Sequence, residues 1–290
     1  MLGGRLSAAH KVITKGCIVK TLLKYKKNYY SQNGEDGITE EILKRLGINN
    51  GWFVEFGAWD GRELSNTFFL LEKGWKGVDI EADEAKYRDL LKTAKEFSGR
   101  LFTACAKISI GGDNSLDSLL SNTPIPKEFE ILSIDIDSYD WWAWKTLNNY
   151  DPKIVIIEIN SAYPPEMKFV QPPNMIASDS LLSGASFTST LHLGDEKGYR
   201  LVCHTSNMFF VRKDLVNKLN LPQEELTSPD SLFIENWLLF KRENKICLCF
   251  VILFQRIRAL VRSLIKKTCP NIYQKLKEIK KSFKDRAGRH

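Results

Sequence analysis

Apolar residues along this chain fall into short continuous runs that alternate with longer stretches in which they recur every three or four positions. Continuous runs bounded by turn residues are typical of buried strands, and the wider spacing is typical of amphipathic helices. The pattern predicts strands at 52–55, 77–81, 101–106, 131–135, 154–159, 199–204 and 207–212, and helices at 36–46, 64–73, 83–97, 115–121, 140–148 and 185–197. Strands that alternate with helices indicate an α/β fold with a doubly wound, mostly parallel sheet, here of seven strands. The last two strands follow each other closely, so we expect them to form a C-terminal hairpin.

The two ends of the chain depart from this pattern through their charge. Residues 1–30 carry seven Lys and Arg and no acid, and residues 241–290 carry fifteen Lys and Arg against three acids. The middle keeps 20 of the 42 basic residues and 32 of the 35 acidic ones, which is a net charge of −12. We therefore expect a basic N-terminal segment (1–30), an acidic folded domain (31–240) and a basic helical tail (241–290). Basic ends on an acidic body favour an anionic surface that the ends contact.

The C-terminal tail combines an apolar run with interleaved cations. Nine consecutive apolar residues at 246–254 are followed by five basic residues that alternate with apolar ones as far as Lys267. A bilayer span needs about 20 apolar residues, so we expect an amphipathic helix that lies on an anionic membrane surface. The alternatives are a helix that packs on the domain, or on a second copy of the chain in a homodimer. No nucleic-acid-binding motif is present, so we expect no nucleic-acid partner.

Cysteine usage and the start of the chain bear on localisation. The six cysteines have neither zinc-site nor redox-pair spacing, which favours reduced thiols in the cytoplasm. The first thirty residues lack the long apolar stretch of a signal peptide. We expect a cytoplasmic protein, held peripherally at the inner face of the cytoplasmic membrane if the tail binds there. A mitochondrial presequence is the alternative interpretation of the basic, acid-free segment 1–30.

Candidate chemistry begins at the first two predicted strands. The first ends in the pattern Glu55-x-Gly57-x-x-x-Gly61, and a glycine turn at a strand end lets a ligand approach the backbone closely. The spacing differs from the Gly-x-Gly-x-x-Gly of pyrophosphate sites, and an acid at this place suits a ligand with an amine or a positive charge. The second strand ends in Glu81, about 20 residues later, where an acid accepts hydrogen bonds from ribose hydroxyls. Together these features predict a nucleoside site.

The acid–glycine loop followed by a strand-end acid resembles the S-adenosylmethionine site of class I methyltransferases. Later segments are similar in order and spacing to the FkbM-type methyltransferases, and earlier ones resemble bacterial members found among surface-polysaccharide genes. These segments are 115–119, 132–140 and 153–158, and then 31–37 and 64–67. The resemblance covers about residues 31–213. It implies a Rossmann-like sheet, S-adenosylmethionine as cofactor and a role in polysaccharide biosynthesis.

The resemblance also assigns residues to the cofactor. Gly57, Ala58 and Gly61 are expected on its methionine side, and Glu81 at its ribose. The set of expected cofactor-binding residues is Glu55, Gly57, Ala58, Gly61, Glu81, Ala106 and Asp135. Ala106, at the end of the third strand, is expected near adenine together with Lys107. Glu55 has two interpretations: it orients the loop or the cofactor's amine, or it caps the amides of its own loop.

The ends of the fourth and fifth strands carry the candidates for the chemical step. The family segment usually reads Lys-Ile-Asp-Val-Glu-Gly-x-Glu; here Ser133 replaces the Lys, and Asp137 and Asp140 replace the two Glu. Oxygen ligands from neighbouring strand ends suit Mg²⁺ or another divalent cation, and the expected ligands are Asp137, Glu158 and Asn160. A metal there lowers the pKa of the hydroxyl that is attacked.

Two further interpretations need no metal. In one, Asp137 or His192 acts as the general base. In the other, the acids bind substrate hydroxyls or cap loops. Trp141, Trp142 and Trp144 follow the acidic segment, and either pack in the core or stack on a sugar ring.

The function that these features favour is S-adenosylmethionine-dependent O-methylation of a sugar hydroxyl. The acceptor is a surface glycan or its lipid- or nucleotide-linked precursor. One alternative is a metal-dependent glycosyltransferase that uses Asp135-x-Asp137, which leaves the Glu55–Gly61 loop unexplained. The other is a membrane-attached scaffold without catalysis, against which the complete set of cofactor motifs argues.

Overall fold

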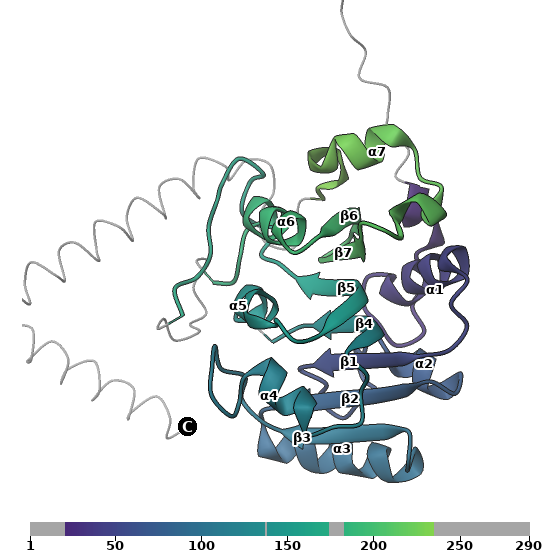
Figure 1. The fold of residues 1–290 in the computed structure, drawn as a ribbon, viewed down its shortest axis with the longest axis vertical. Helices are drawn as coiled ribbons and strands as arrows, with labels where there is room; N and C mark the ends of the chain where they lie inside the picture. Colours follow the sequence, from purple (N-terminus) through teal and green to yellow (C-terminus); the bar gives the residue numbers. More distant parts are fainter. Residues whose placement is uncertain (1–20, 137, 174–182, 235–290) are drawn as a thin grey trace, which may run out of the picture. The chain divides into compact units, whose positions relative to one another are not determined.

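The computed structural model describes residues 21–136, 138–173 and 183–234 (Figure 1). The chain divides into two units, residues 1–235 and 236–290, and all described residues belong to the first. The predicted amphipathic helix of the tail, residues 1–20 of the basic N-terminal segment, and Asp137 therefore lie outside the described residues.

The described unit is built on one seven-stranded sheet in the order β3-β2-β1-β4-β5-β7-β6. The strands are β1 Trp52–Phe56, β2 Lys76–Glu81, β3 Leu101–Cys105, β4 Glu128–Ile134, β5 Asp151–Glu158, β6 Tyr199–His204 and β7 Asn207–Arg212. β1 to β5 pair in parallel, whereas β7 is antiparallel to both β5 and β6. This arrangement confirms the predicted Rossmann-like fold with its C-terminal hairpin.

Two hydrophobic cores lie on the two faces of the sheet, because successive side chains of a strand point to opposite faces. Phe53 of β1 packs in the core that also holds Ile38, Leu70 and Leu90 of α1, α2 and α3. Val54, the next residue, packs in the other core with residues of α4, α5 and α6. The helices are α1 Glu35–Leu46, α2 Phe68–Glu72, α3 Glu84–Glu96, α4 Leu116–Ser121, α5 Asp140–Thr146, α6 Phe187–Glu196 and α7 Gln223–Thr227.

Two differences from the predicted elements have local causes. The helix expected at 64–73 begins only at Phe68, because Ser65 and Thr67 donate their hydroxyl hydrogens to the Glu55 carboxylate. β5 begins at Asp151 rather than at 154, with Pro152 as its second residue. A proline at the start of a strand forgoes only one ladder hydrogen bond, and Phe129 of β4 still pairs with it in register.

Residues 21–30, which belong to the predicted N-terminal segment, pack against the α/β fold. Leu22 is buried, and the backbone and hydroxyl of Thr21 donate to Glu225 Oε1 at 2.9 and 2.7 Å. Asp36 Oδ2 accepts the amides of three successive residues, Tyr29, Tyr30 and Ser31. Glu225 lies in α7, which the hydrophobic pattern did not predict, so α7 is one of the contacts that hold this segment.

Candidate cofactor and acceptor site

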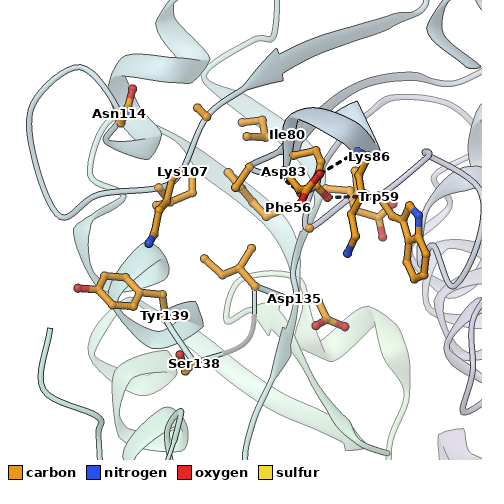
Figure 2. A pocket seen from close by; sticks show the side chains of 18 of the residues that line it. Phe56, Trp59, Ile80, Asp83, Lys86, Lys107, Asn114, Asp135, Ser138 and Tyr139 are labelled. Carbon is orange, nitrogen blue, oxygen red and sulfur yellow. Dashed lines mark hydrogen bonds between the residues drawn. The ribbon is translucent and has the colours of Figure 1, made fainter. Parts of the chain in front are cut away.

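A pocket of about 1380 Å³ opens where the carboxyl ends of β1, β2, β3 and β4 meet (Figure 2). Parallel strands place their carboxyl ends at one edge of the sheet, which is where open α/β folds bind ligands. The pocket exceeds the usual 300–1,000 Å³ or so of a site for one small molecule, and so has room for a nucleoside cofactor beside an acceptor. Six of the seven residues expected to bind the cofactor line it, namely Glu55, Gly57, Ala58, Glu81, Ala106 and Asp135, whereas Gly61 does not.

Glu55 holds the segment that follows the glycine loop. Its carboxylate accepts hydrogen bonds from Ser65 Oγ at 2.5 Å, Thr67 Oγ1 at 2.6 Å and Asn66 N at 2.7 Å. Burial raises the pKa of Glu55, these hydrogen bonds oppose the rise, and the nearby charge of Asp135 adds to it. The structure thus matches the interpretation in which Glu55 caps its own loop.

The glycine loop is folded back against the neighbouring strands. Gly57 has φ 70° and Gly61 φ 77°, a left-handed region that favours glycine. The amides of Gly57 and Ala58 both donate to Ile80 O of β2, at 3.1 and 3.3 Å. A Cβ on Gly57 would come within 1.9 Å of the Asp135 carbonyl oxygen. Gly57 is therefore required where the β1 loop meets the β4 loop.

Glu81 lies at the end of β2 with its carboxylate fixed by two backbone amides. Oε2 accepts from Trp59 N at 2.9 Å and Oε1 from Asp83 N at 2.7 Å. Each carboxylate oxygen has two lone pairs, so this side chain still has acceptor capacity toward the pocket. The backbone oxygen of Glu81 accepts from Ala106 N at 3.0 Å, which joins the ends of β2 and β3. Glu81 and Ala106 thus lie at neighbouring strand ends, and both line the pocket.

Exposed apolar side chains at this pocket were not among the expected site residues. Trp59, Leu64 and Ile110 line it with exposed fractions of 37%, 44% and 39%. The Trp59 ring lies under Lys86, whose Nζ is 4.4 Å from the ring centroid. The sequence signal that could have found Trp59 is its position between Gly57 and Gly61. A side chain in a glycine turn has no strand or helix face on which to be buried.

The loop after β4 is folded around Asp140. Asp140 Oδ1 accepts from Ile136 N at 2.8 Å, and Oδ2 accepts from Ser138 N at 3.1 Å. Burial and the nearby charge of Asp135 raise the pKa of Asp140 to about 7. Figure 2 shows Asp135 and Ser138 on this side of the pocket, with Trp59, Asp83 and Lys86 on the other. Asp137, the expected base or metal ligand, lies outside the described residues.

The other expected ligands and the second expected base do not line the pocket. Asn160 Oδ1 accepts from Ala162 N at 3.1 Å and its Nδ2 donates to Ser183 O at 3.2 Å, so its amide holds the loop after β5. Glu158 ends β5. His192 is solvent-exposed on α6, so the structure does not bring its imidazole to the pocket. Within the described ranges, no three His, Cys, Asp or Glu side chains are grouped as metal ligands.

The tryptophan cluster after β4 packs and ties elements together. Trp144 is fully buried against Tyr199 and Phe210. Trp141 Nε1 donates to Ser189 O at 3.2 Å and Trp142 Nε1 to Gln171 O at 2.8 Å. None of the three lines the pocket, so the packing interpretation is the one that fits, and Trp59 is the indole exposed to a ligand.

No protein-family model and no curated protein sequence matches this chain. Solved structures similar to it include an S-adenosylmethionine-dependent methyltransferase from Clostridium acetobutylicum, with 8% identity, coverage of 62% of this chain and 92% of that one, and a TM-score of 0.38. TrmK of M. capricolum in complex with S-adenosyl-homocysteine has 12% identity, coverage of 82% and 92%, and a TM-score of 0.38. An S-adenosylmethionine-dependent methyltransferase from Aquifex aeolicus has 12% identity, coverage of 60% and 87%, and a TM-score of 0.35. Such distant likeness does not carry function, and what this chain does has to be inferred from the residues of its pocket.

Proposed function

We propose that this chain transfers a methyl group from S-adenosylmethionine to a sugar hydroxyl of a surface glycan or of its lipid- or nucleotide-linked precursor. The observation that carries the proposal is Glu81: a buried carboxylate at the end of β2, held toward the pocket by two amides. An acid at this place suits ribose hydroxyls. Ala106 and the apolar side chains of Ile80 and Ile108 line the same pocket and suit a purine.

The chain's contribution to the reaction is positioning and proton removal. S-adenosylmethionine supplies a methyl group on a sulfonium, and the acceptor oxygen has to lie in line with it, so most of the acceleration comes from alignment. The strand order puts β1 between β2 and β4. With Glu81 at the ribose, the acceptor is therefore expected at the β4 loop. Asp137, in that loop, is the proposed general base.

The first experiment measures transfer of a tritiated methyl group from S-adenosylmethionine to a glycan fraction from cells that lack the gene. We expect incorporation by the wild type and none by Asp137→Ala, with S-adenosylhomocysteine affinity nearly unchanged in the variant. EDTA distinguishes a bound metal from a general base. Activity that is lost in EDTA and restored by Mg²⁺ supports a metal held by Asp137, and activity that persists in EDTA supports Asp137 as the base. Absence of incorporation by the wild type would contradict the proposed function.

The proposed location of this chemistry is an anionic membrane surface reached through the tail. No described helix is long and apolar enough to span a membrane. The apolar run and cations at 246–267 support interfacial binding at about 1 kcal/mol per nearby basic residue. Truncation after Phe240 should abolish sedimentation with anionic liposomes, and binding of the full chain should weaken as salt rises. A full chain that ignores such liposomes at low salt would contradict this part of the proposal.

A further inference from the structure

Strained backbone gathers at the pocket. Among the described residues, four that are not glycine have positive φ: Trp59 at 50°, Leu64 at 61°, Ser138 at 97° and Asn220 at 50°. The first three line the pocket. Conformations of this kind are strained and concentrate at functional sites. Ser138 departs furthest from the left-handed helical value of about 57°, in a region that glycine adopts most readily.

Ser138 carries a second cost in its side chain. The residue is 8% exposed, and its buried Oγ has no hydrogen-bond partner among the described residues. Of the described residues that line the pocket, it is the one with such a side-chain atom. A buried polar group without a partner destabilises the folded chain, because it has lost its hydrogen bonds to water. Glycine at this position would remove both costs, so folding alone does not account for a serine here.

The surroundings of Ser138 place it at the acceptor end. Its amide is fixed by Asp140 Oδ2 at 3.1 Å, so the residue has a defined position. Figure 2 shows Ser138 beside Tyr139 on one wall of the pocket, with Lys107 pointing toward Tyr139. The Tyr139 hydroxyl already donates to Pro173 O. The Ser138 hydroxyl is thus a polar group of this wall that the fold leaves for a ligand.

We propose that the Ser138 hydroxyl binds a second hydroxyl of the acceptor, next to the one that is methylated. A serine hydroxyl donates one hydrogen bond and accepts others, which suits a neutral hydroxyl that does the same. The acceptor class is therefore a sugar with neighbouring free hydroxyls, and Ser138 is a specificity-determining residue that acts by direct contact. The inference rests on the proposed function and adds to it which side chain selects the acceptor.

The test compares Ser138→Gly with Ser138→Ala. Both variants lack the hydroxyl, but only glycine also relieves the backbone. We expect kcat/KM for the glycan fraction from cells that lack the gene to fall about tenfold in both, which is the loss of one hydrogen bond at about 1.4 kcal/mol per tenfold. Most of the fall should be a rise in the acceptor KM. The affinity for S-adenosylhomocysteine, followed by calorimetry, should stay within about twofold of the wild type.

Thermal unfolding supplies the independent readout. The Tm of Ser138→Gly should exceed that of Ser138→Ala by about 2–4 °C for each kcal/mol of relieved strain, and neither variant should be less stable than the wild type. Variants that match the wild type in kcat/KM overturn the inference and leave the proposed function intact. A tenfold loss of S-adenosylhomocysteine affinity also overturns the inference, because the hydroxyl would then contact the cofactor. A Tm of Ser138→Gly below that of Ser138→Ala overturns it as well. A wild type that transfers no methyl group to the fraction removes the proposed function and this inference with it.

Discussion

The two sides of the pocket satisfy their polar groups differently. On the β1–β2 side, Glu55 and Glu81 accept five hydrogen bonds from loops of the same protein at 2.5–2.9 Å. On the β4 side, the Ser138 hydroxyl has no partner among the described residues and the backbone carrying it is strained. The carboxylates of the first side are held in place by the protein before a ligand binds, whereas the second side has a buried hydroxyl without a partner among the described residues.

This difference shows how one fold meets two requirements, the binding of a cofactor and the discrimination between acceptors. A cofactor site gains from rigid loops, since binding then costs little ordering. An acceptor site must tell one hydroxyl-bearing molecule from another, and an unpaired buried polar group discriminates strongly, because only the right ligand satisfies it. Substitutions that break the contact between the two sides, or that change one side alone, test this difference.

The largest effect is expected at Gly57, where the two sides touch. Gly57→Ala forces a Cβ against the Asp135 carbonyl oxygen at a left-handed φ, so overpacking of about 1–3 kcal/mol adds to backbone strain of about 1–2 kcal/mol. We expect the free energy of unfolding to fall by about 2–5 kcal/mol, measured in urea, and S-adenosylhomocysteine binding to be lost.

Gly74→Ala is the matched control for this change. Gly74 has φ 97°, and a Cβ there meets no atom within 4 Å, so this variant pays the backbone strain without the clash. It should lose no cofactor affinity and less stability than Gly57→Ala. Equal losses of stability in the two variants would mean that the contact between the β1 and β4 loops contributes nothing.

The second prediction concerns Asp140, the residue that folds the β4 loop. Its pKa is raised from 3.8 to about 7 in the folded chain. The folded chain therefore keeps a proton that the unfolded chain has lost, and the resulting stability is complete below about pH 4 and disappears as the pH rises through 7. At about 1.4 kcal/mol for each unit between the two pKa values, the loss is at most about 4 kcal/mol.

Asp140→Asn removes this titration, so the stability difference between wild type and variant should shrink from pH 4 to pH 8. Urea denaturation at a series of pH values measures it. Asp83→Asn is the control of opposite sign, because hydrogen bonds from the amides of Lys86 and Ala85 lower the pKa of Asp83. Its contribution should disappear on acidification instead. If the difference in the free energy of unfolding between the wild type and Asp140→Asn stays constant with pH, the proton on Asp140 does not contribute to stability.

The same two sides mark what could be predicted from the sequence. The strand ends and glycines of the β1–β2 side have local signatures, so the sequence predicts that Gly57 and Glu81 lie at neighbouring strand ends, and both line the pocket. The β4 side depends on tertiary geometry: the conformation of Ser138 follows from how Asp140 closes the turn, and a serine gives no local signal of a positive φ. His192 shows the same limit, since helical spacing does not tell which neighbouring elements leave a side chain facing solvent.

The smallest effect is expected at Glu81, and it tests the observation on which the proposed function depends. Glu81→Ala removes the acceptor of the ribose hydroxyls, so S-adenosylmethionine affinity should fall by about 1–3 kcal/mol, as measured by calorimetry. The variant also frees the amides of Trp59 and Asp83, which by itself could loosen the loops. Asp117→Ala controls for that, because Asp117 also accepts two backbone amides, those of Asn148 and Asn149, and does not line the pocket. If only Glu81→Ala weakens binding, Glu81 contacts the cofactor; if neither does, Glu81 only clamps its own loops, and the methyltransferase assignment loses its main support.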